Sequence, residues 1–61
     1  MIPIERHEVF GVAYEFYIHR EEKYAARIRV YDVDAQELVG VTFYPTVEMA
    51  RAAYAKLIQV S

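Results

Sequence analysis

Three stretches of this chain alternate between apolar and mixed side chains with a period of two, and a fourth repeats at spacings of three and four. The alternating stretches are residues 9–19, 23–33 and 38–44, and the fourth is 46–58. Period two is typical of a strand with one buried face, whereas spacings of three and four indicate an amphipathic helix. The order therefore predicts an α+β fold, β-β-β-α, in which a three-stranded antiparallel meander carries one C-terminal helix on one face.

Turn and cap residues separate the four predicted elements. Residues 19–23, HREEK, are charged and suit a hairpin loop, and residues 32–37, DVDAQE, carry aspartates that favour turns. Pro45 closes the third strand because it cannot donate to a ladder, and Thr46 is a favourable N-cap. The apolar residues that the helix should bury are Val47, Ala50, Tyr54, Leu57 and Ile58.

A register for the two hairpins follows from keeping like faces together. In the first hairpin this requirement places Glu15 opposite Arg27. Across both hairpins it places Tyr31 between Gly11 and Gly40, where its ring would cover the bare backbone of the glycines.

A chain of 61 residues is short for a stable domain. Residues 1–61 form a single small domain, and a domain of this size buries only about 60% of the surface of its unfolded chain. The chain has no cysteine, which excludes disulfides and thiolate metal sites, and its two histidines do not make a structural zinc site by themselves. Of the usual sources of extra stability, oligomerisation remains.

Charge and hydropathy bear on the environment of the protein. A formal net charge of −2 argues against a strong general attraction to nucleic acid or to anionic membranes. No apolar run reaches the ~18 residues of a transmembrane helix, and the start, MIPIERHEV, lacks the pattern of a signal peptide. We therefore expect a cytoplasmic protein without membrane contact.

The sequence matches no catalytic, cofactor or metal motif. DVDAQE begins like a calcium loop at Asp32 and Asp34, but Glu37 stands where such a loop needs glycine. Glu21 and Glu22 lie in a charged loop without the apolar pocket that would raise the pKa of a catalytic carboxyl group. We expect no enzymatic activity and no cofactor.

The predicted helix covers one face of the sheet and leaves the other face open. Apolar surface rimmed by charge is typical of interaction sites, and tyrosine and arginine are enriched in interfaces. We therefore predict a small interaction module, most simply a homo-oligomer, that acts through this open face with itself or another protein partner. The residues of the predicted interaction surface are Glu15, Tyr17, Arg27, Arg29, Tyr31, Thr42 and Tyr44.

Two other interpretations of the same face stay open. It can be a solvated sheet face with cross-strand pairs, on which tyrosines serve only as good strand formers. It can also bind DNA through Arg27 and Arg29 together with Tyr17, Tyr31 or Tyr44. A three-stranded sheet can enter a major groove, and aromatic faces can stack on bases.

A pattern of eight residues within residues 23–57 supports the DNA-binding interpretation. The eight residues, in chain order, are Tyr24, Ala26, Ile28, Gly40, Phe43, Thr46, Ala50 and Tyr54. In this order the stretch resembles the three-stranded-sheet-plus-helix DNA-binding domains of ethylene-response transcription factors, and it is similar to the arm-type N-terminal domains of phage integrases. The resemblance implies that outward sheet residues read DNA, and in this chain these are Arg27, Arg29 and Tyr31.

Overall fold

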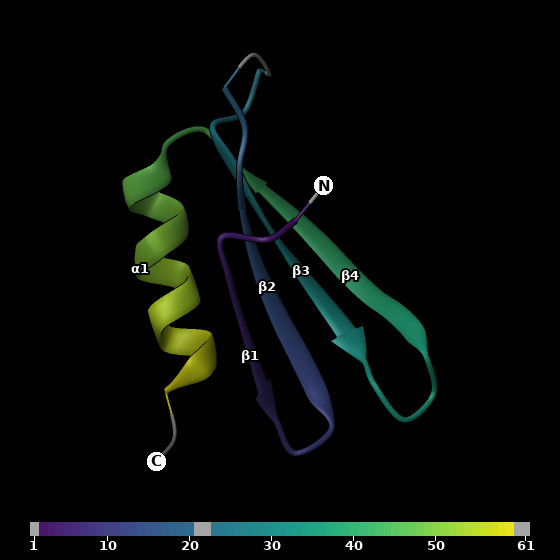
Figure 1. The fold of residues 1–61 in the computed structure, drawn as a ribbon. Helices are drawn as coiled ribbons and strands as arrows, with labels where there is room; N and C mark the ends of the chain where they lie inside the picture. Colours follow the sequence, from purple (N-terminus) through teal and green to yellow (C-terminus); the bar gives the residue numbers. More distant parts are fainter. Residues whose placement is uncertain (1, 21–22, 60–61) are drawn as a thin grey trace.

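The alternating stretches form one antiparallel sheet, and the last stretch forms a helix that lies against it (Figure 1). The computed structural model describes residues 2–20 and 23–59. The elements are β1 (Glu5–Val9), β2 (Val12–Ile18), β3 (Ala26–Asp32), β4 (Glu37–Tyr44) and α1 (Val47–Ile58). The fold is α+β, and consecutive strands are neighbours in the sheet, in the order β1-β2-β3-β4.

The sheet has one strand more than the sequence pattern predicts. The stretch predicted as a single strand over residues 9–19 contains the end of β1, a turn and β2. Phe10 and Gly11 make the turn, with φ values of 49° and 79°. Positive φ at both central residues is the conformation of a common two-residue hairpin turn. Phenylalanine is an unusual residue there, so the alternation continues through the turn and hides it. The prediction of three strands is therefore wrong, although the meander and the C-terminal helix are confirmed.

The pairing of β2 with β3 is shifted by two residues from the predicted register. Glu15 lies opposite Arg29 rather than Arg27, and Arg27 lies opposite Tyr17. The shift is even, so every side chain stays on its predicted face. The pattern of faces alone therefore does not distinguish the two registers.

The pairing of β4 is shifted by an odd number of residues, which exchanges its two faces. Thr42 lies opposite Ile28, and Tyr44 packs against the core, whereas Phe43 lies opposite Arg27. The predicted positions of Thr42 and Tyr44 on the open face are wrong. The sequence LVGVTFY is largely apolar on both sides, so its alternation does not select the side that is buried.

A β-bulge adds to the irregularity of β4. Gly40 lies opposite Val30, whereas Leu38 lies opposite Tyr31, so Val39 is an extra residue in the pairing. Because Tyr31 pairs with Leu38 rather than Gly40, its predicted place between two glycines is also wrong.

The start of α1 and the turn before β4 are as the sequence predicts. The Met49 N–H donates to Thr46 Oγ1 at 3.2 Å, which confirms Thr46 as the N-cap. The Ala35 N–H donates to Asp32 Oδ1 at 3.0 Å in the β3–β4 turn. The charged loop predicted for residues 19–23 includes Glu21 and Glu22, which lie outside the described residues.

The core lies between α1 and the middle of the sheet. Phe16 and Ile28 are its largest fully buried side chains, and Ala50 and Tyr54 close it from the helix. Leu57, predicted to be buried, is exposed. Within residues 2–20 and 23–59, no helix has the length and apolar character needed to span a membrane. The half-buried residues around the core are Tyr14, Ile18, Tyr44, Val47, Ala53 and Ile58.

Candidate functional site

The side of the sheet away from α1, here called the open face, collects side chains from all four strands. Five of the seven residues predicted for the interaction surface lie on it, and Thr42 and Tyr44 do not. The strand registers assign to the open face Arg6, Glu8, Ala13, Glu15, Tyr17, Arg27, Arg29, Tyr31, Leu38, Val41 and Phe43.

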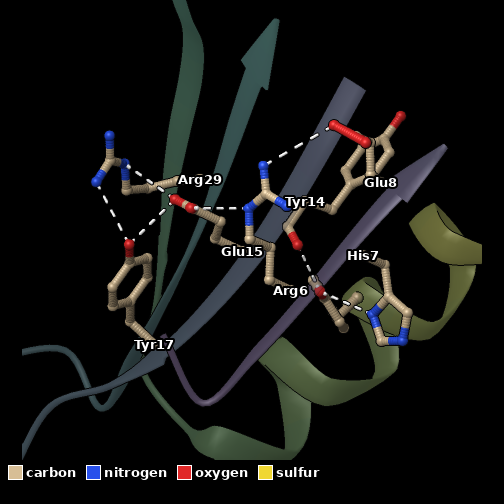
Figure 2. Close-up of polar contacts among 8 residues, drawn as sticks. Arg6, His7, Glu8, Tyr14, Glu15, Tyr17 and Arg29 are labelled. Atoms are coloured by element: carbon tan, nitrogen blue, oxygen red, sulfur yellow. Dashed lines mark hydrogen bonds and ion pairs between the residues drawn. The ribbon is translucent and has the colours of Figure 1, made fainter. Parts of the chain in front are cut away.

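Glu15 is the centre of a charged cluster on the β1–β2–β3 half of the open face (Figure 2). Its Oε2 lies 3.6 Å from Arg6 Nε, and its Oε1 lies 3.7 Å from Arg29 Nε. The Tyr17 hydroxyl donates to the same Oε1 at 3.0 Å, and Arg6 Nη2 also lies 4.0 Å from Glu8 Oε1. One carboxylate therefore compensates the charge of two arginines that would otherwise be available to a ligand.

Tyr17 is covered by the arginines of the neighbouring strand. The guanidinium carbon of Arg27 lies 4.4 Å from the centroid of the Tyr17 ring, and that of Arg29 lies 5.9 Å from it. Only 3% of Tyr17 is exposed, and Ala13, four residues earlier on the same face of β2, is fully buried. These cation–π contacts close the centre of the open face. Tyr17 is therefore not accessible as an aromatic anchor, although the sequence places it on the correct face.

Apolar surface is exposed on the β4 half of the open face. Leu38, Val41 and Phe43 are 45%, 39% and 49% exposed, and we call these three residues the β4 patch. The His19 ring stacks on Phe43 with 6.4 Å between centroids, and the Tyr24 ring lies 5.6 Å from it. The sequence pattern missed Val41 and Phe43 because it assigned them to the buried side of β4.

Arg27 borders the β4 patch. It lies opposite Phe43 on one side and opposite Tyr17 on the other. Its Nε is buried, as is His19 Nε2, and neither atom has a hydrogen-bond partner among the residues that the structure describes. A positive charge and an imidazole ring therefore flank the exposed Phe43 ring.

We expect the Glu15→Ala variant to lose about 1–3 kcal/mol of its free energy of unfolding, because the Tyr17 hydroxyl and two arginines lose their common acceptor. Glu8→Ala is the matched control, since Glu8 is exposed and surface changes usually cost within ~0.5 kcal/mol. Urea unfolding of both variants measures the difference. Equal stability of the two variants would show that the charged cluster contributes little to folding.

Comparisons with models of protein families, with curated proteins and with solved structures find no match to this chain. The resemblance to sheet-plus-helix DNA-binding domains therefore stays a prediction from the sequence. In the part of the chain that the structure describes, no group of three or more His, Cys, Asp or Glu side chains is placed to hold a metal ion.

Proposed function

We propose that this protein is a small non-enzymatic interaction module that self-associates and buries the β4 patch when it does so. The observation that carries the proposal is the exposure of Val41 and Phe43, two residues apart on one face of one strand. Exposed apolar surface bordered by charge is a common mark of a protein interface. Arg27 and Arg29, opposite Phe43 and Val41 on β3, supply that charged border.

The size of the core supports the same proposal. Among the described residues, the large side chains of the buried core cluster are Phe16, Ile28 and Tyr54. A core of this size supplies at most about 3–5 kcal/mol of stability. Burial of further apolar surface is worth roughly 25 cal/mol per Å², so covering Val41 and Phe43 stabilises the folded chain as well as the assembly.

The arrangement of charge favours a protein partner over nucleic acid. Glu15 forms ion pairs with Arg6 and Arg29, and a phosphate that took either arginine would lie close to this carboxylate. Arg27 is held over the Tyr17 ring. DNA binding through Arg27, Arg29 and Tyr31 remains the alternative function, and it requires several arginines free to neutralise phosphates.

We expect the protein to elute above its monomer mass of 7.2 kDa at micromolar concentration, with a melting temperature that rises with concentration. Phe43→Ser should return it to the monomer mass because the exposed ring of the β4 patch is lost. Phe10→Ser is the control, since Phe10 is even more exposed but lies in the β1–β2 turn, away from the patch. Size-exclusion chromatography with light scattering measures all three proteins.

Two results would contradict the proposal. The first is a wild-type protein that stays monomeric at the highest concentration reached. The second is binding of a labelled DNA duplex that weakens steeply with salt and is lost in the Arg27→Glu/Arg29→Glu double variant but kept in Phe43→Ser. Such salt dependence reports counterions released from phosphates, and it would select the DNA-binding alternative.

A further inference from the structure

The two edge strands of the sheet differ in how well they are protected. An edge strand presents unpaired backbone groups, and proteins commonly shield them with short strands and charged side chains. β1, with the sequence ERHEV, is short and mostly charged or ionisable. β4, with the sequence ELVGVTFY, is the longest strand, and Glu37 at its start is its only charged residue. At the edge of the sheet opposite β1, β4 is therefore open to pairing (Figure 1).

We infer that β4 pairs antiparallel with β4 of a second copy of this chain, so that two four-stranded sheets join into one across a twofold axis at Thr42. The inference rests on the proposed self-association and specifies its geometry. The bulge at Val39 interrupts β4, so the regular part of its edge is residues 40–44, GVTFY. Thr42 is the midpoint of this segment, and an antiparallel pair of identical segments meets at its midpoint.

The segment is complementary to itself in this register. On the open face, Val41 lies opposite the partner's Phe43, a pairing of a β-branched with an aromatic side chain that stabilises sheets. On the other face, Gly40 lies opposite the partner's Tyr44. A Cβ built on Gly40 meets no atom within 4 Å, so there is room for an aromatic ring to cover its backbone. No charged residue lies in the segment, so no like charges meet at the seam.

A second copy fits this edge better than an unrelated strand does, because the twofold symmetry supplies the Val41–Phe43 pair and the Gly40–Tyr44 pair twice each. The pairing also continues the open face from one copy into the other. The two β4 patches then meet at the seam, where Val41 and Phe43 of one copy adjoin those of the other. Edge pairing therefore accounts for burial of part of the patch in the assembly.

Introducing a charge at Thr42, on the twofold axis, tests the register. Thr42→Lys and Thr42→Glu should each associate roughly tenfold more weakly than the wild type or worse, because two like charges face each other at the axis. An equimolar mixture of the two variants should regain association, since opposite charges then meet. Thr42 is exposed and on the α1 side of the sheet, so the fold tolerates both changes. Ala52→Lys and Ala52→Glu, at an exposed position of α1, are the matched controls and should associate like the wild type.

Sedimentation velocity of the single variants and of the mixture separates this inference from the proposed function. Because Thr42 is not on the open face, association of two open faces would not respond to its charge. Wild-type association that is lost in Phe43→Ser but unchanged in both Thr42 variants would overturn the edge pairing and leave the proposed function standing. Monomeric Thr42 variants whose mixture also stays monomeric would overturn the twofold axis at Thr42. A monomeric wild type would overturn both.

Hydrogen exchange of the wild-type protein gives a test that needs no variant. The amides of residues 40–44 that do not bond to β3 should gain protection as the protein concentration rises, whereas the amides of β1 that do not bond to β2 should not. Protection that is independent of concentration throughout residues 40–44, in a protein that does associate, would overturn the edge pairing.

Discussion

Replacement of Phe16 by alanine is expected to remove about 3–5 kcal/mol from the free energy of unfolding, which is comparable to the whole stability of a domain of this size. Phe16 is 0% exposed and lies where β2 faces the helix. Its ring centroid is 5.5 Å from that of Tyr54, and the Arg51 guanidinium carbon lies 5.0 Å from it. The truncation leaves a cavity in the place of a ring that contacts both the sheet and the helix. We therefore expect a protein that is largely unfolded at room temperature.

Phe43→Ala is the matched control for this prediction, because it removes the same ring from a half-exposed position on the same sheet. Circular dichroism melts should be compared at a concentration low enough for the protein to be monomeric. The control should then melt close to the wild type. If Phe16→Ala melts within a few degrees of the control, the assignment of the core to this face of β2 is wrong.

The helix and the faces of β2 and β3 can be predicted from sequence because each depends on a strongly asymmetric local pattern. Phe16 and Ile28 alternate with Glu15 and Arg27, so burying the wrong face would bury charge. Thr46 follows a proline and precedes an apolar repeat, which marks the start of α1 without tertiary information.

The β1–β2 turn and the faces of β4 could not be predicted because their local patterns are ambiguous. Phe10 takes a left-handed conformation that its side chain does not favour, and it does so where the Gly11 carbonyl accepts from the Val33 N–H at 2.9 Å. This contact joins two hairpins that are far apart in sequence. For β4, apolar residues stand at both odd and even positions, and the side facing α1 carries Thr42 rather than the more apolar Val41.

The sequence predicts which strands contribute to the candidate site, but it does not predict which of their side chains are accessible. The alternation predicts the correct face for Arg27 and Arg29, but their position over Tyr17 depends on the β2–β3 register, which the alternation leaves open by two residues. The alternation of β4 predicts that Phe43 is buried, whereas the observed register, with its bulge, leaves it as the largest exposed side chain of the β4 patch. Long-range pairing therefore decides which aromatic residues a partner can reach.

Tyr54→Ala should destabilise the protein by about 3–5 kcal/mol as well, since Tyr54 is buried and joins α1 to the sheet by its ring and by its hydroxyl. The hydroxyl donates to the Tyr14 carbonyl at 2.6 Å and lies 3.1 Å from His7 Nδ1, which can donate to it in turn. Tyr54→Phe is the control that keeps the ring, and it should cost about 1–3 kcal/mol for the lost hydrogen bonds. Chemical denaturation of both variants separates the two contributions.

The same hydroxyl predicts a loss of stability in alkali. Burial, followed by the nearby Glu5 carboxylate, raises the pKa of Tyr54 above its usual value of 10.0. The unfolded chain therefore loses this proton at a lower pH than the folded protein does. The contribution of the neutral hydroxyl is fully present below pH 10 and is lost as pH rises through the raised pKa of the folded state. In Tyr54→Phe this step is absent, so its stability should fall less steeply above pH 10 than that of the wild type. If the two proteins lose stability in parallel there, the Tyr54 hydroxyl is not the buried group that the structure places between α1 and β2.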